Sequence, residues 1–202
     1  MTNADYTHLT LVVDRSGSMS SIQDEAQGGI NALIAEQFGL PGKLTVTLSQ
    51  FDDAFDTVQR MSGSPFAYEL EPRGMTALFD AVGMEVVRTG QDLAGLPEDQ
   101  RPGRVLLVVV TDGHENSSHE YTVEKVRAML SVQREQFGWE VRFLGADDAA
   151  WQGEALGVGT TRYANTASGN RAVYASMSGS MRAYRDAPVG AALEMPDLIE
   201  GD

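Results

Sequence analysis

Short apolar runs alternate with segments of helical periodicity along most of the chain. His8–Val13 and Arg104–Thr111 are rich in β-branched residues, and the second contains six consecutive Val or Leu residues. Such runs are typical of parallel strands that are covered on both faces. Apolar residues at helical spacing follow each run, over 22–38 and over 123–137. The pattern predicts an α/β fold with a doubly wound, mostly parallel central sheet and helices on both faces.

Two further strand-like runs, 44–51 and 55–61, are separated only by Asp52, Asp53 and Ala54. A turn of this length cannot contain a crossover helix, so the pair is expected to form a hairpin with one antiparallel edge strand. We interpret both acids as turn residues, with a place for the turn on the ligand-binding rim of the sheet left open. The remaining expected elements are helices from about residue 76, over 149–156 and over 168–185, and strands over 140–144 and 160–163.

No repeat, linker or low-complexity segment interrupts the chain, so one domain is expected over residues 1–186. Residues 187–202 hold four acids, no base and two prolines, and we interpret them as an acidic C-terminal tail, either docked or frayed. The large side chains expected in the core of the last third of the chain are Trp151, Met177, Met181 and Tyr184.

Composition narrows the classes of partner. The 202 residues include 15 Lys and Arg against 29 Asp and Glu, which gives a formal net charge of −14 and disfavours nucleic acid and membrane surfaces. The absence of cysteine excludes disulfides, thiolate-bound metals and a thiol nucleophile. No apolar run reaches the roughly 18 residues of a spanning helix, and the N-terminus does not resemble a signal peptide. We therefore expect a cytoplasmic protein.

Oxygen-bearing side chains gather where three elements are expected to meet one edge of the sheet. Asp14, Ser16 and Ser18 follow the first strand, Thr76 lies at the start of a helix, and Asp112 follows the most apolar strand. Ligands of open parallel sheets bind beyond the carboxyl ends of the strands, so the five residues are candidates for one site. Two carboxylates and three hydroxyls are hard donors that suit Mg²⁺, with Mn²⁺ or Ca²⁺ as alternatives.

Three segments together resemble a known motif. Asp14-x-Ser16-x-Ser18, Gly74–Ala81 and Val110–Gly113 are similar to the three parts of the metal-ion-dependent adhesion site (MIDAS) of the von Willebrand factor A (vWA) domain family. The resemblance covers roughly residues 6–185. It implies a Rossmann-like vWA fold, of the stand-alone type known from bacteria and phages.

The resemblance also implies roles for the five residues. Ser16, Ser18 and Thr76 are expected to ligate the metal directly, while Asp14 and Asp112 complete or support its coordination shell. The implied function is a non-enzymatic module that docks a partner protein, whose Asp or Glu side chain completes the Mg²⁺ coordination. A shift of the last helix is expected to accompany docking, and an AAA+ ATPase or a stress-response complex is one family-level partner.

Other classes of function remain open at this stage. One is a structural subunit of a larger complex or of a phage particle. Another is a metal-dependent hydrolase built on Ser16, His114 and Asp112. The hydrolase is disfavoured because Asp14 and Ser18 occupy the glycine positions of a nucleophile elbow, and because His114 is only two residues from Asp112 on one loop.

Several polar residues near these segments have two interpretations. Asp14 and the two serines either bind the metal or merely cap the next helix. Asp80 is interpreted as structural, and Arg15 either steers an acidic ligand or is solvated. A polar cluster after Asp112 either holds a second metal or, as we prefer, forms a solvated rim that shapes partner choice; it consists of His114, Glu115, Asn116 and His119.

Overall fold

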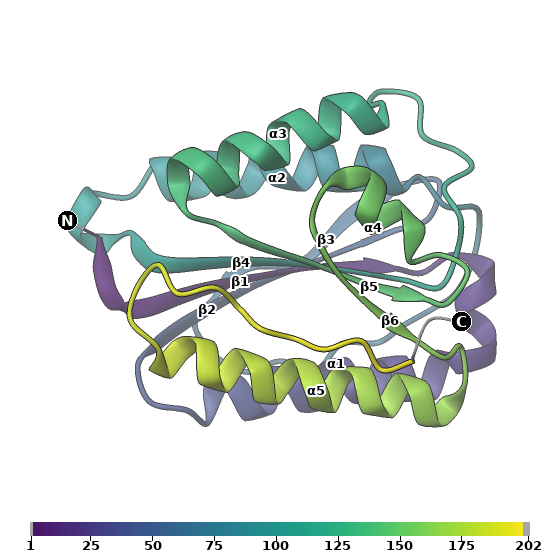
Figure 1. Ribbon diagram of the computed structural model, residues 1–202, viewed down its shortest axis with the longest axis horizontal. Helices are drawn as coiled ribbons and strands as arrows, with labels where there is room; N and C mark the ends of the chain where they lie inside the picture. Colours follow the sequence, from purple (N-terminus) through teal and green to yellow (C-terminus); the bar gives the residue numbers. More distant parts are fainter. Residues whose placement is uncertain (1, 200–202) are drawn as a thin grey trace.

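The computed structural model describes residues 2–199. Their six strands form one sheet in the order β3-β2-β1-β4-β5-β6, in which only β3, at one edge, runs antiparallel (Figure 1). The strands are β1 (Asn3–Asp14), β2 (Lys43–Phe51), β3 (Phe55–Ser62), β4 (Pro102–Thr111), β5 (Glu140–Ala146) and β6 (Gly159–Tyr163). The predicted fold class is confirmed, including the hairpin, because three residues suffice to reverse the chain but not to cross over.

Helices cover both faces of the sheet. Helices α1 and α5 pack on one face, and α2, α3 and α4 lie on the other (Figure 1). Their bounds are α1 (Gln23–Phe38), α2 (Leu78–Ala94), α3 (Val123–Phe137), α4 (Trp151–Leu156) and α5 (Ala167–Asp186), and two 3₁₀ segments are η1 (Gly17–Ile22) and η2 (Glu98–Gln100).

The two faces of β1 differ in chemistry. Leu9, Leu11 and Val13 belong to the apolar core under α1 and α5. On the opposite face, His8 and Thr10 are fully buried but polar, and they hydrogen-bond to each other between His8 Nε2 and Thr10 Oγ1 at 3.1 Å. The apolar run of β1 therefore conceals a buried polar layer beneath α2, which the sequence pattern did not predict.

Some core assignments need correction. Met177, Met181 and Tyr184 are buried as expected. Trp151 was expected in the core, but it is 50% exposed because it is the first residue of α4 and lies at the end of the sheet. Phe137, the last apolar residue in the predicted pattern and the last residue of α3, is 64% exposed.

Residues 187–199 pack against the domain and run back beside α5 (Figure 1). Leu193 and Met195 are buried in the core between the sheet and α5. The backbone amide of Leu198 donates to the carbonyl oxygen of Arg162 in β6 at 3.0 Å, and the Arg162 amide donates to Asp197 Oδ1 at 3.1 Å. The docked alternative therefore describes this part of the tail; residues 200–202 lie outside the described residues.

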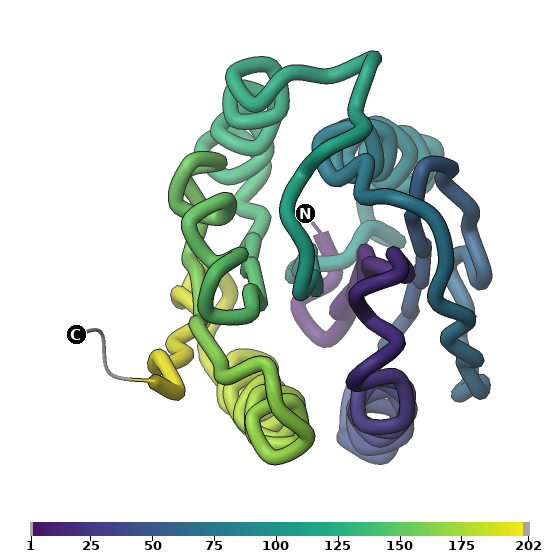
Figure 2. The backbone as a smooth tube through the Cα atoms, turned by 90° about the vertical axis from the view of Figure 1, so that its right-hand side faces the viewer, coloured from purple at the N-terminus to yellow at the C-terminus, as the bar shows by residue number. Residues whose placement is uncertain are grey.

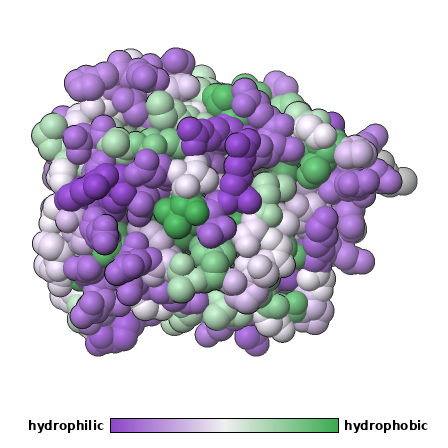
Figure 3. Space-filling model, turned by 180° about the vertical axis from the view of Figure 1, so that it is seen from behind, coloured by the Kyte–Doolittle hydropathy of each residue, from purple (hydrophilic) through white to green (hydrophobic). Residues whose placement is uncertain are grey.

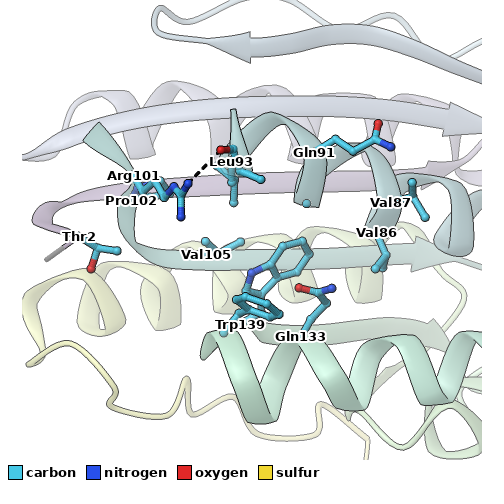
Figure 4. Close-up of a pocket in the computed structure, with 13 residues that line it drawn as sticks. Thr2, Val86, Val87, Gln91, Leu93, Arg101, Pro102, Val105, Gln133 and Trp139 are labelled. Carbon is cyan, nitrogen blue, oxygen red and sulfur yellow. Dashed lines mark hydrogen bonds between the residues drawn. The ribbon is translucent and has the colours of Figure 1, made fainter. Parts of the chain in front are cut away.

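Away from the carboxyl end of the sheet, the surface has small apolar patches (Figure 3) and an apolar hollow. The face seen from behind carries small hydrophobic patches scattered among hydrophilic residues (Figure 3). An apolar hollow of about 430 Å³ lies between α2, α3 and the start of β4, lined by side chains that include Val86, Leu93, Val105 and Trp139 (Figure 4). Within residues 2–199, no helix combines the length and apolarity needed to cross a bilayer.

Candidate metal site at the carboxyl ends of β1 and β4

Three loops converge where β1 and β4 end. They follow β1, precede α2 and follow β4, and in Figure 2 they appear in purple, blue and teal at the end of the sheet that faces the viewer. Strands β1 and β4 are parallel neighbours with Val13 opposite Val110, so Asp14 and Thr111 leave the sheet side by side. The register of two central strands thus places Asp14 and Asp112 near each other.

Hydrogen bonds link four of the five predicted residues. Ser18 Oγ donates to Asp112 Oδ1 at 2.6 Å and lies 3.0 Å from Ser16 Oγ. The backbone amide of Ser16 donates to Asp14 Oδ1 at 2.6 Å. Thr111 Oγ1 donates to Asp14 Oδ2 at 2.5 Å, so this strand-end residue fixes the rotamer of the Asp14 carboxylate.

The fifth residue, Thr76, shares a small space with two of the others. A methyl carbon built on Gly113 would lie 3.2 Å from both Ser18 Oγ and Thr76 Oγ1 and 3.4 Å from Asp14 Oδ2. Three oxygens from two loops therefore surround one point, which is kept open by the lack of a side chain at Gly113 of the third loop. A cradle of hard oxygen donors around such a point fits a small divalent cation.

Burial controls the charge of the two carboxylates. It raises the pKa of Asp14 to about 6, although hydrogen bonds from Thr111 and Ser16 oppose the rise and the nearby charge of Asp112 adds to it. Burial also raises the pKa of Asp112, against hydrogen bonds from Ser18 and from the Asn165 side chain. Two buried carboxylates with raised pKa values form an electrostatic environment that a cation would stabilise.

The helix-capping alternative is wrong for the first loop. Ser16 stands at the N-cap of η1 but its side chain makes no capping hydrogen bond. Helix α1 begins only after Ile22. The Oγ atoms of Ser16 and Ser18 instead face each other, and that of Ser18 donates to Asp112.

The polar cluster after Asp112 holds the loops in place. Asn116 Oδ1 accepts from the Thr76 amide at 2.9 Å, and the Asn116 amide donates to the Thr76 carbonyl oxygen at 3.0 Å. The Glu115 carboxylate accepts from the backbone amides of Ser117, Ser118 and Phe79. Within residues 2–199, no group of three or more His, Asp or Glu side chains is arranged to hold a metal, so the structure lends no support to a second ion here.

Asp80 is structural, as interpreted from the sequence. Its Oδ1 accepts from the amides of Glu120 and Tyr121 at 2.9 and 2.7 Å, and its Oδ2 accepts from the amide of His119 at 2.8 Å. The first turn of α2 thereby anchors the far end of the loop that follows β4.

The side chains of the hydrolase alternative do not form a triad. Ser16 Oγ is paired with Ser18, and Asp112 Oδ1 accepts from Ser18. His114 Nε2 lies 2.8 Å from the carbonyl oxygen of Asp148, and its ring meets Trp151 edge-on with centroids 6.2 Å apart. A histidine turned to Asp148 cannot serve as the base for Ser16 in this arrangement.

Sequence reasoning missed two supporting residues near the site. Arg15 is neither solvated nor directed at a ligand, because its buried guanidinium forms ion pairs with Asp52 and Asp56 at 3.0 and 2.6 Å. Asp52 closes the hairpin turn as expected, but it is buried and also pairs with Arg73 at 2.7 Å. In the sequence, only the Asp52-Asp53 pair indicated such a role, and two consecutive acids are equally typical of a simple turn.

Comparison with known proteins identifies the fold. No family model matches the sequence, and no curated protein matches it. Solved structures do match over most of the chain. One is a von Willebrand factor type A structure from Catenulispora acidiphila, with a TM-score of 0.61, 13% identity, and coverage of 87% of this chain and 42% of that chain.

Two other solved structures match this chain with similar TM-scores. The vWF domain of the type V pili tip protein Mfa5 from Porphyromonas gingivalis has a TM-score of 0.60 at 8% identity, covering 88% of this chain and 95% of that chain. Proximal thread matrix protein 1 from the mussel byssus, with a zinc-occupied MIDAS motif, has a TM-score of 0.63 at 11% identity, covering 88% and 46%. The chain spans 42–46% of the first three structures matched. It has the fold of von Willebrand factor A domains.

Proposed function

We propose that this protein binds a divalent cation, Mg²⁺ foremost, and docks a partner protein whose Asp or Glu side chain completes the coordination. Asp14, Ser16, Ser18, Thr76 and Asp112 would hold the ion. The observation that carries the proposal is the meeting of Ser18 Oγ, Thr76 Oγ1 and Asp14 Oδ2 around one point beside Gly113.

The donor set suits docking better than turnover. Two carboxylates balance the charge of a divalent ion, and neutral hydroxyls leave the ion able to attract a further carboxylate. A bound cation would supply that Lewis acidity, while the protein orients the ligands through Thr111, which holds Asp14, and Ser18, which holds Asp112. Among residues 2–199, His114 is turned to Asp148 and does not stand beside Ser16 as a base, so we propose a binding module rather than an enzyme.

The neighbours by fold support a metal and a protein partner in general terms. The mussel protein carries zinc in its MIDAS motif, and two other matches are a pilus adhesin and a pilus tip protein. The all-oxygen donor set favours Mg²⁺, Mn²⁺ or Ca²⁺ over zinc, and Mg²⁺ among these three stays a prediction from the sequence. A cytoplasmic location, a bacterial or phage origin and an AAA+ ATPase or stress-response partner stay predictions from the sequence.

Net charge limits which partner can dock. An acidic side chain must approach a protein with a formal charge of −14, and Asp147 and Asp148 are exposed beside α4. We therefore expect the partner to carry its carboxylate on an otherwise neutral or basic surface, since like charges would slow encounter and weaken binding.

Calorimetric titration tests the metal site. Mg²⁺ added to the wild type should give one saturable site, and Asp14→Ala should abolish it. Asp148→Ala is the matched control, because it removes an exposed carboxylate near the site that accepts no site hydrogen bond through its side chain. Equal binding by the wild type and Asp14→Ala would refute the site.

A pull-down tests the docking. Tagged protein is incubated with cell extract in Mg²⁺ or in EDTA, and partners are identified by mass spectrometry. A prey retained in Mg²⁺, lost in EDTA and lost with Asp14→Ala supports docking through the ion. A prey retained equally in both buffers would instead support the structural-subunit alternative.

A further inference from the structure

The turn between β2 and β3 lies directly against two of the three loops of the candidate site. Asp52, at its start, has a side chain that is only 2% exposed. Its Oδ1 accepts from the Ala54 amide at 2.6 Å, which closes the turn. Its Oδ2 faces two arginines from other loops, with Arg15 Nε at 3.0 Å and Arg73 Nε at 2.7 Å.

Each of these arginines belongs to a loop that carries candidate ligands. Arg15 stands between Asp14 and Ser16, and Arg73 precedes Thr76 by three residues. The main chain of Asp52 adds a third link, because its carbonyl oxygen accepts from the Ala77 amide at 2.8 Å. One residue outside both loops therefore contacts the neighbours of Asp14, Ser16 and Thr76.

The two loops are also tied to each other beside Asp52. The Arg73 amide donates to the Arg15 carbonyl oxygen at 2.7 Å, and the Gly17 amide donates to the Gly74 carbonyl oxygen at 3.2 Å. These contacts leave no spare room: a methyl carbon on Gly74, which has φ of +68°, would lie 2.2 Å from Asp53 Oδ1. The turn thus fixes the separation of the loops.

Charge reinforces this arrangement. Asp52 brings a carboxylate to two guanidinium groups, of which that of Arg15 is buried while Arg73 is 59% exposed. Hydrogen bonds and buried ion pairs between charged groups are the strong and geometrically specific ones. Without Asp52, the guanidinium of Arg15 would lose one of its two carboxylate partners, and only Asp56 would remain.

We infer that Asp52 is a positioning residue, which holds the loop of Asp14, Ser16 and Ser18 at a fixed distance from Thr76 and so prepares the site for a cation. The metal part of this inference rests on the proposed function. The loop part does not, since it concerns the protein's own contacts. Two other ion pairs of the hairpin differ from that of Asp52. Asp56 of β3 pairs with Arg15 at 2.6 Å, and Arg60 of β3 pairs with Asp92 in the last turn of α2, at the other end of that helix.

The test compares Asp52→Asn with Asp92→Asn, which removes the carboxylate of an Asp–Arg pair that joins the same hairpin to the far end of α2. Hydrogen–deuterium exchange in EDTA reports on the loops without metal. In Asp52→Asn we expect the amides of residues 15–17 and 73–77 to exchange about ten-fold faster, as for the loss of one charged hydrogen bond, whereas Asp92→Asn leaves them unchanged. Unchanged exchange in Asp52→Asn would overturn the inference.

Metal affinity is the second readout, measured with Mn²⁺ by electron paramagnetic resonance of the free ion. Mutation of a residue that supports metal ligands typically lowers metal affinity by about ten- to a hundred-fold. We therefore expect Asp52→Asn to bind Mn²⁺ about ten-fold more weakly than the wild type, and Asp92→Asn to bind it equally well. Wild-type affinity in Asp52→Asn would count against Asp52. No binding by the wild type would refute the proposed function, while exchange would still decide whether Asp52 holds the loops.

Arg73→Gln guards against a folding defect in Asp52→Asn. Arg73 is largely exposed, so its replacement should leave the fold intact and should speed exchange in the same two loops by a smaller factor. The double variant should change little beyond Asp52→Asn alone, since both substitutions break the same contact. Fully additive effects would show that Asp52 and Arg73 do not act through one shared contact.

Discussion

Ser18 Oγ donates a 2.6 Å hydrogen bond to Asp112 Oδ1 across 94 positions of sequence. A hydroxyl has one proton and two lone pairs, so this bond leaves the oxygen of Ser18 free to accept from Ser16 or to ligate a cation. The carboxylate of Asp112 is thereby held beside the site through a neutral ligand. This hydrogen bond joins the loops that follow β1 and β4.

Gly113→Ala should block the site while leaving the fold intact. The added methyl carbon would lie 3.2 Å from Ser18 Oγ and from Thr76 Oγ1, in the space proposed for the cation. The backbone of Gly113 has no positive φ, so alanine adds no backbone strain there. We expect Mg²⁺ binding to fall below detection by calorimetry.

Gly63→Ala is the control for that substitution, because a methyl carbon at Gly63 meets no atom within 4 Å. It should bind Mg²⁺ as the wild type does. Both variants should keep the wild-type circular dichroism spectrum. Undiminished affinity in Gly113→Ala would place the cation somewhere other than beside Gly113.

Asp80→Ala should destabilise the protein. The substitution leaves the amides of His119, Glu120 and Tyr121 without their acceptor, and loss of such a partner costs about 1–3 kcal/mol. Asp80→Asn keeps one acceptor oxygen and should cost less. Urea unfolding measures both, and an unchanged midpoint for Asp80→Ala would show that water replaces the carboxylate at no cost.

The sequence predicted the five candidate ligands because each lies next to a strand end or helix start, and parallel strands bring such ends together. To predict that Asp14 and Asp112 lie close together, the order of the strands and helices was enough. The residues that hold these ligands in place could not be predicted from the sequence. The hydrogen bond from Thr111 to Asp14 depends on the register of β1 and β4, and the contacts of Asp52 depend on how three loops pack. Register and loop packing are properties of the assembled sheet, which no local pattern encodes.

Trp151 shows a second limit of pattern reading. An apolar residue at the start of a helix is expected in the core, but α4 has only six residues and Trp151, its first, is 50% exposed. Trp151→Ala should therefore change the free energy of unfolding by under about 0.5 kcal/mol, whereas Trp139→Ala, at a buried position, should cost about 3–5 kcal/mol. Chemical denaturation of both variants checks the contrast, and equal losses would contradict the exposed placement of Trp151.

The buried polar layer under α2 makes stability depend on pH through His8. Its Nδ1 lies 2.8 Å from Thr45 Oγ1, and burial lowers its pKa from 6.5 to about 4, although the nearby charge of Asp92 opposes the shift. Glu85 of α2 joins the same layer through Thr89 and Thr10, and burial raises its pKa. The layer therefore favours a neutral imidazole facing acids that α2 contributes.

The direction in which stability changes with pH follows from the number of protons that each state binds. The unfolded chain protonates His8 near pH 6.5 and the folded protein only near pH 4, so between these values the unfolded state binds more protons. Stability from neutral His8 is complete above pH 6.5 and is lost as the pH falls to about 4, by on the order of 3 kcal/mol. His8→Gln cannot take up this proton, and Glu85 and Asp92 are present in both proteins. The difference in unfolding free energy between wild type and His8→Gln should therefore shrink by about that amount from pH 7 to pH 4. A constant difference would mean that the folded protein protonates His8 as readily as the unfolded chain does.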